Sequence, residues 1–177
     1  IRFTAGERSD LLKNEVLNGF IADDYQMVSD INGKYYKCFK EVLPLYKSWI
    51  DNSSLVFGDL LTKKNTEYSL SMPKTCRYYV SATRKDLERS GKHILYFNDL
   101  YDMEFAYCIL NSSFSYLYWR MYDGSVTFTE GLLKSMPVFS NILSVSQKEE
   151  LHNIVSDMIN KEKDYLVYKK NANEMQE

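Results

Sequence analysis

The sequence predicts an α+β fold, with a mixed antiparallel sheet and hairpins in the first two-thirds and helices in the last third. Asn32-Gly33 is a strong hairpin signal, because this dipeptide suits the type I′ turn that joins two antiparallel strands. Short apolar and aromatic runs at residues 78–82 and 94–97 have strand composition. Apolar residues recur at helical spacing beyond residue 98, and the last such pattern predicts a long amphipathic helix.

The first 60 residues predict two helices around one hairpin. These elements are a helix that begins after Ser9 or Asp10 and ends at Gly19, strands over residues 27–31 and 34–39, and a helix over residues 43–50 that residues 52–54 break. Gly suits the left-handed position that follows a helix. Pro44 falls in the first turn of the second helix, where its missing N–H is tolerated.

The centre of the chain predicts two strands, at residues 78–82 and 94–97, joined by a polar connection of ten residues. A helix then begins at Asn98 or Asp99 and runs through Leu110. Asn111 can close this helix, and Ser112 or Ser113 can cap the next one through an orphan backbone amide.

The last third predicts three further helices. They are an aromatic helical run over residues 114–122, a short helix that Thr129 caps and Pro137 stops, and a terminal helix that begins with a capping box at residues 146–149 and reaches about Tyr168. Asp123-Gly124 is a turn signal between the first two. Residues 169–177 read as a frayed end.

The composition suits one globular domain with a helical appendage. The 177 residues are 45% hydrophobic and 26% charged, which is enough to bury a core. We therefore divide the chain into a domain over residues 1–145 and an amphipathic helix over residues 146–177, packed on that domain or on a partner. The chain begins with Ile rather than Met, so we expect it to be a fragment of a longer protein.

We expect a cytoplasmic location, with no membrane contact. No apolar run approaches the ~20 residues that a membrane span needs, and no signal peptide is recognisable. The three Cys are far apart and form no zinc-binding pattern with His93 or His152, so we expect free thiols and no metal site.

Basic charge is concentrated in one segment of an acidic chain. Residues 61–93 contain eight Lys or Arg and three acidic residues, a net charge of +5 within a chain whose net charge is −2. Such a cluster fits either a solvated face or a nucleic-acid-binding surface.

The sequence lacks the common catalytic motifs. It contains no Gly-x-Gly cofactor loop, no Pro-Pro dipeptide, and no Asp or Glu two residues before a Lys. The absence of a Pro-Pro dipeptide excludes methyl transfer by this chain alone, and the third absence excludes a PD-(D/E)xK nuclease. We expect no catalytic residues and no bound cofactor, although a small enzyme whose site assembles from dispersed residues stays open.

A family resemblance rests on the region between Tyr96 and Val138. Its pattern is a helix break at residues 109–113, an aromatic-Arg pair at residues 119–120, a glycine turn, and a closing Met-Pro-Val at residues 136–138. This pattern resembles the C-terminal target-recognition domain of DNA adenine-N6 methyltransferases in type II and IIG-like (TaqI-like) restriction-modification systems. The resemblance extends from about Lys74 to the end of the terminal helix, and residues 1–60 match only loosely.

The resemblance implies a non-catalytic domain that recognises double-stranded DNA. It would position the duplex for a methyltransferase domain of the same or a partner chain, which would bind S-adenosylmethionine and extrude the target adenine. Whether that parent enzyme also cleaves DNA stays open. The helix break and the aromatic run are expected to form scaffold rather than base contacts.

Candidate DNA contacts follow from what duplex recognition needs, namely cations for phosphates and polar groups for base edges. They are Lys74, Arg77, Arg84, Lys85, Arg89, Lys92, Arg120, Tyr122, Ser125 and Thr127. For Arg120 an alternative is that its stem packs on Trp119 or Tyr116 and its head meets a carboxylate. The alternative function is a protein-interaction or dimerisation module that acts through the apolar stripe of the C-terminal helix.

Overall fold

A computed structural model describes residues 25–29, 35–39, 43–76, 79–122, 126–139, 143–165, 169–171 and 174–176. The helix expected after Ser9 or Asp10 and the two predicted turns at Asn32-Gly33 and Asp123-Gly124 lie outside these ranges.

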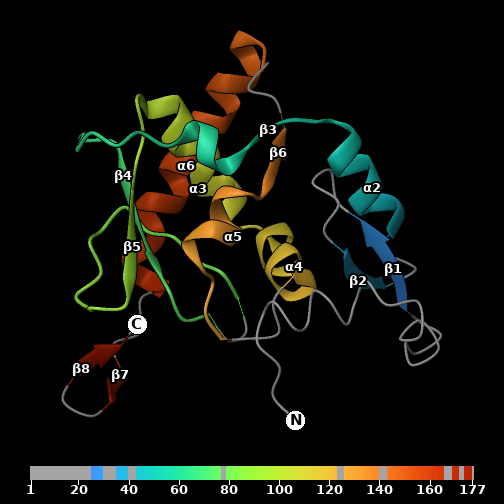
Figure 1. The fold of residues 1–177 in the computed structure, drawn as a ribbon. Helices are drawn as coiled ribbons and strands as arrows, with labels where there is room; N and C mark the ends of the chain where they lie inside the picture. The colour runs from blue at the N-terminus through green and yellow to red at the C-terminus, as the bar shows by residue number, and fades with distance from the viewer. Residues whose placement is uncertain are drawn as a thin grey trace.

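The described residues form an α+β fold made of helices and two-stranded antiparallel ladders (Figure 1). The elements in chain order are β1 (Tyr25–Ser29), β2 (Tyr35–Phe39), α2 (Leu43–Asp51), β3 (Ser53–Val56), the 3-10 helix η2 (Phe57–Leu60), β4 (Ser69–Pro73), β5 (Lys92–Tyr96), α3 (Leu100–Leu110), α4 (Ser113–Tyr122), α5 (Glu130–Lys134), β6 (Pro137–Phe139), α6 (Val145–Tyr165), β7 (Lys169–Asn171) and β8 (Glu174–Gln176). The pairs are β1–β2, β3–β6, β4–β5 and β7–β8. The predicted fold class is confirmed.

The core is aromatic and is centred on α3 and α4. The largest fully buried side chains include Tyr118 and Trp119 of α4, together with Phe57, Phe97 and Phe128. The rings of Trp119 and Phe128 stack with their centroids 6.4 Å apart. Since Tyr118 and Trp119 lie in the middle of the aromatic run, these two residues have the scaffold role that the sequence predicts.

Local capping signals set the helix boundaries as expected. The Asp99 side chain accepts from Asp102 N–H and caps α3, and the Thr129 side chain accepts from Leu132 N–H and caps α5. Asn111 is the C-cap of α3. Helix α5 already ends at Lys134, however, and Pro137 begins β6 rather than stopping that helix.

The strand predicted over residues 78–82 is wrong in the part that the structure describes, because residues 79–82 belong to no strand. The Asn111 side chain takes the place of a neighbouring strand. Its Oδ1 accepts from Ala82 N–H at 3.1 Å, and its Nδ2 donates to Ala82 O at 3.0 Å and to Tyr107 O at 2.9 Å. An amide side chain can pair with a backbone donor and acceptor together, so Ala82 is satisfied without a ladder.

The second predicted strand, at residues 94–97, is present as β5 and pairs with β4, which the sequence did not indicate. The N-terminal hairpin is present with a shifted register. Ser29 pairs with Tyr35, whereas a two-residue turn at Asn32-Gly33 would pair Ser29 with Tyr36.

The terminal helix differs from the prediction at both ends. Its capping box is formed by Ser144 and Gln147, because Ser144 N–H donates to Gln147 Oε1 at 2.9 Å and Gln147 N–H donates to Ser144 Oγ at 3.3 Å. The helix ends at Tyr165, and the short strands β7 and β8 follow where a frayed end was predicted. None of the helices described is long and apolar enough to cross a membrane.

Helix α6 packs along α3 within the chain. Val155 is fully buried, and Leu151 and Ile159, one turn away on either side, pack against the core. His152 Nδ1 lies 2.6 Å from Glu104 Oε1 of α3. The Tyr107 hydroxyl donates to Glu162 Oε1 at 2.8 Å. Two further apolar residues of this helix, Ile154 and Met158, are exposed.

Candidate nucleic-acid interface

Two predicted candidate regions meet in a short ladder outside the named strands. Residues 74–76 run antiparallel to residues 126–128, with a bridge between Thr75 and Thr127. Phe128 N–H donates to Lys74 O, and Cys76 N–H donates to Val126 O, both at 2.8 Å. We call these two segments the 75/127 ladder.

The end of the basic loop joins the same place. Lys74 N–H donates to Gly91 O at 2.9 Å, so the loop that contains Lys85 and Arg89 returns beside the 75/127 ladder. From the other direction, Trp119 Nε1 lies 3.4 Å from Thr127 O and connects the ladder to α4. Segments around residues 74, 91, 120 and 127, which are far apart in the sequence, therefore form one region of the fold.

The 75/127 ladder combines buried and exposed side chains. Cys76 and Phe128 are buried in the core, whereas Lys74, Thr75 and Val126 are exposed. Burial raises the pKa of the Cys76 thiol to about 11, and the nearby charge of Arg89 acts in the opposite direction. The thiol is therefore neutral near pH 7 and serves as a core group.

The basic loop is braced by its own side chains. Asp86 Oδ1 accepts from Lys92 Nζ at 2.6 Å and from Ser71 Oγ at 2.9 Å, and Lys92 Nζ also donates to Leu87 O at 2.7 Å. The hydrogen bond from Lys92, followed by that from Ser71, lowers the pKa of Asp86. The Leu87 side chain is buried. These contacts hold the loop in one shape before any ligand binds.

Arg84 is also turned toward the protein. One of its terminal nitrogens donates to Ser69 O at 3.2 Å and to Glu67 O at 3.3 Å, and the backbone N–H of Arg84 donates to Glu162 Oε1 at 3.2 Å. Glu162 also accepts from Tyr107, whose pKa is raised by burial and then by this hydrogen bond. Arg84 and Lys92 thus act as structural braces, whereas Lys74 is exposed and Arg89 is partly exposed.

The remaining predicted residues divide into two groups. Arg120 is exposed, and its guanidinium carbon lies 5.3 Å from the centroid of the Trp119 ring, so the head of this side chain, rather than its stem, is placed over that ring. Thr127 belongs to the ladder. Arg77 and Ser125 lie outside the described residues, and the side chain of Tyr122 is not among those described.

Sequence reasoning missed three exposed residues of this region. Thr75 and Val126 are on the 75/127 ladder, and Tyr79 follows it closely in the chain, with 63% of its surface exposed. Tyr79 was assigned to a strand, and an isolated Val carries no signal that separates a surface position from a core position. Only the tertiary pairing identifies Thr75 and Val126.

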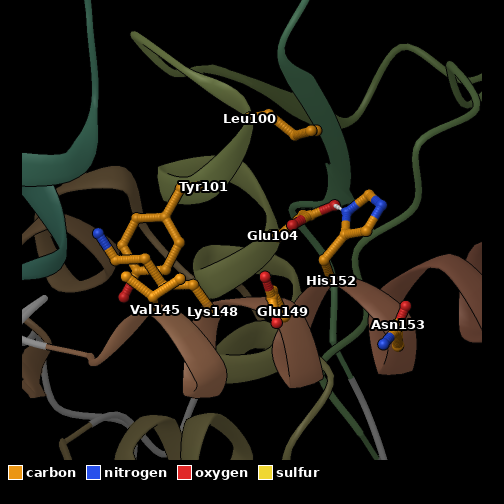
Figure 2. A pocket seen from close by; sticks show the side chains of 8 residues that line it. All are labelled: Leu100, Tyr101, Glu104, Val145, Lys148, Glu149, His152 and Asn153. Carbon is orange, nitrogen blue, oxygen red and sulfur yellow. Dashed lines mark hydrogen bonds and ion pairs between the residues drawn. The ribbon is translucent and has the colours of Figure 1, made fainter.

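A separate groove lies between the N-terminal halves of α3 and α6 (Figure 2). It measures about 560 Å³ and is lined by Leu100, Tyr101, Glu104, Val145, Lys148, Glu149, His152 and Asn153. Lys148 Nζ lies 4.3 Å from the centroid of the Tyr101 ring, and Figure 2 shows His152 turned toward Glu104. None of these lining residues is a Ser, Thr or Cys that could serve as the nucleophile beside His152 and Glu104. The lining residues therefore do not form the usual hydrolytic triad.

Within the part of the chain that the structure describes, no three His, Cys, Asp or Glu residues are grouped as metal ligands. Comparison of the chain with protein-family models, with curated proteins and with solved structures found no match. The resemblance to target-recognition domains therefore stays a prediction.

Proposed function

We propose that this chain is a non-catalytic DNA-recognition domain, which binds double-stranded DNA through the 75/127 ladder and the adjoining basic loop. In the full system it positions the duplex for an adenine methyltransferase domain of the same or a partner chain, and that domain binds S-adenosylmethionine. The observation that carries the proposal is the meeting of the ladder with the end of the basic loop through the Lys74–Gly91 hydrogen bond.

The chemistry of this region suits a nucleic acid. Lys74 and Lys85 are exposed cations that can contact phosphates. Arg89, four residues after Lys85 in the basic loop, is partly exposed. The Thr75 hydroxyl can donate to or accept from a base edge or a phosphate. Because the braces at Asp86 and Glu162 order the loop in advance, little conformational entropy is lost when DNA binds.

Duplex binding with a steep salt dependence is the expected result. Fluorescence anisotropy with a labelled duplex should show binding at ~50 mM salt, and three phosphate contacts would weaken it roughly 40-fold at ~200 mM, since each contact releases counterions. A chain that stays folded but binds no duplex at ~50 mM, or whose binding ignores salt, would contradict the proposal.

A second candidate function is self-association through α6. The observation in its favour is the exposed pair Ile154 and Met158, which lie one helical turn apart beside the buried Val155. We expect sedimentation equilibrium to give a dimer that the double change I154S/M158S returns to a monomer. A monomeric wild-type chain at ~100 μM would exclude even a weak dimer of this kind.

A further inference from the structure

The groove between α3 and α6 contains a buried carboxylate. Glu104 is only 4% exposed, and its Oε1 lies 2.6 Å from His152 Nδ1. Burial of a carboxylate is costly unless charged or hydrogen-bonding partners replace the lost water. A carboxylate offers about four lone-pair sites on its two oxygens, so the pairing with His152 leaves capacity for a further donor.

The groove also contains an aromatic face that carries a cation. Lys148 Nζ lies 4.3 Å from the centroid of the Tyr101 ring, which is within the range of a cation–π contact. The Tyr101 ring stacks in turn on Phe105, with the two centroids 6.2 Å apart. In Figure 2, Tyr101 and Glu104 extend from α3, and Lys148 extends from α6. Two features of the same groove therefore attract positive charge.

Acidic groups outnumber basic ones around this groove. Its lining residues include two Glu and one Lys. Burial, and then the charges of Asp102 and Asp99, raise the pKa of the Tyr101 hydroxyl, so two further carboxylates act on the same ring. His152 adds a positive charge only when it is protonated. Charge complementarity therefore favours a cation over an anion as the ligand.

The size and the apolar surface of the groove fit a small organic molecule. Its volume of about 560 Å³ is typical of small-molecule sites. Leu100 and Val145, which are 40% and 75% exposed, supply apolar surface where α3 and α6 begin.

We propose that the groove binds a primary amine that carries a short aliphatic or aromatic group. The ammonium donates to Glu104, and the apolar group lies on Leu100 and Val145. This inference goes beyond the proposed function and is independent of it, because none of the lining residues belongs to the 75/127 ladder or to the basic loop.

Probes of similar shape and different charge test the inference. The chain would be titrated with benzylamine, benzyl alcohol and benzoate, and the backbone amide shifts would be followed by NMR. Benzylamine, which is protonated near neutral pH, should bind about tenfold more tightly than benzyl alcohol, because a hydrogen bond between charged partners is stronger than a neutral one. Benzoate should bind more weakly than either, and the shifts should concentrate at residues 100–104 and 145–153.

Two variants assign the effect to this groove. E104Q keeps the shape of the side chain and removes its charge, so it should reduce the preference for benzylamine to about twofold or less. K148M removes a competing cation from the Tyr101 ring and should strengthen benzylamine binding about threefold. Lys148 is exposed, so K148M tests the site even if E104Q disturbs the packing of α6 on α3.

The matched control is K161M, which removes the same charge from a lysine of the same helix. Lys161 is 55% exposed and lies 13 residues after Lys148, about 20 Å along the axis of α6. This variant should bind benzylamine like the wild-type chain.

The inference is overturned if benzylamine binds no more tightly than benzyl alcohol, if the shifts lie outside the groove, if E104Q keeps the full preference, or if K148M weakens binding. Tighter binding of N-acetyl-lysine methylamide than of benzylamine would assign the groove to a side chain of a protein partner and would also overturn it. Duplex binding is measured separately, so none of these outcomes bears on the proposed function.

Discussion

Reversal of two charges beside the 75/127 ladder, in the variant K74E/R89E, should weaken duplex binding by about tenfold or more at ~100 mM salt. Lys74 is exposed on the ladder, and Arg89 lies two residues before Gly91, whose carbonyl accepts from Lys74 N–H. If each cation contacts one phosphate, their loss should also reduce the slope of log affinity against log salt by about 2.

The matched control is K63E/K64E, which changes the net charge by the same amount. Lys63 and Lys64 are exposed and follow Thr62, whose N–H donates to Tyr96 O at one end of the β4–β5 pair. The Pro73–Lys92 pair marks the other end, next to Lys74. A five-residue strand spans about 17 Å, so the control charges lie well away from the ladder.

The control variant should lower affinity only slightly and should keep the salt slope of the wild-type chain. Equal losses in the two double variants would mean that binding depends on overall charge and that the ladder is not the contact surface. Circular dichroism of both variants checks that neither change has altered the fold.

Local signals in the sequence predicted the elements whose ends are set by neighbouring residues. Asp99 and Thr129 each cap a helix through an amide three residues ahead, so the sequence alone contains donor and acceptor. The register of β1 with β2 could not be predicted in the same way, because it depends on the whole hairpin rather than on the Asn-Gly pair.

Elements that depend on distant partners were missed or misplaced. Residues 79–82 have strand composition, but their partner is the Asn111 side chain, 29 residues away from Ala82 in the sequence. Strand β4, with Ser and Pro among its five residues, has no clear strand signal and owes its pairing to β5. Composition describes what a segment prefers, whereas the neighbouring chain decides what it pairs with.

The candidate interface shows the same limit. The sequence gives Arg84, Lys85, Arg89 and Lys92 one common property, which is positive charge in a polar loop. The fold separates them, because Lys92 meets Asp86, whereas Arg84 meets the β4 carbonyl of Ser69. Charge density could be predicted from the sequence, but the direction of each side chain depends on tertiary acceptors.

Truncation of Trp119 should have the largest effect on stability. Its side chain is fully buried, its ring stacks with Phe128 and meets Tyr116 edge-on, and its Nε1 lies 3.4 Å from Thr127 O. W119A leaves a large cavity and should lower the free energy of unfolding by about 3–5 kcal/mol. That is a large share of the 5–15 kcal/mol that is typical of a whole domain.

Urea unfolding followed by circular dichroism measures the effect, with Y79A as the matched control. Tyr79 is also aromatic but is 63% exposed, so its truncation should change the free energy of unfolding by less than about 0.5 kcal/mol. W119F keeps most of the ring packing and loses the Nε1–H, so it should fall between the wild-type chain and W119A. If W119A unfolds at the same urea concentration as the wild-type chain, Trp119 is not the centre of the scaffold. If it unfolds as expected, the aromatic core that joins α4 to Phe128 also supports the 75/127 ladder.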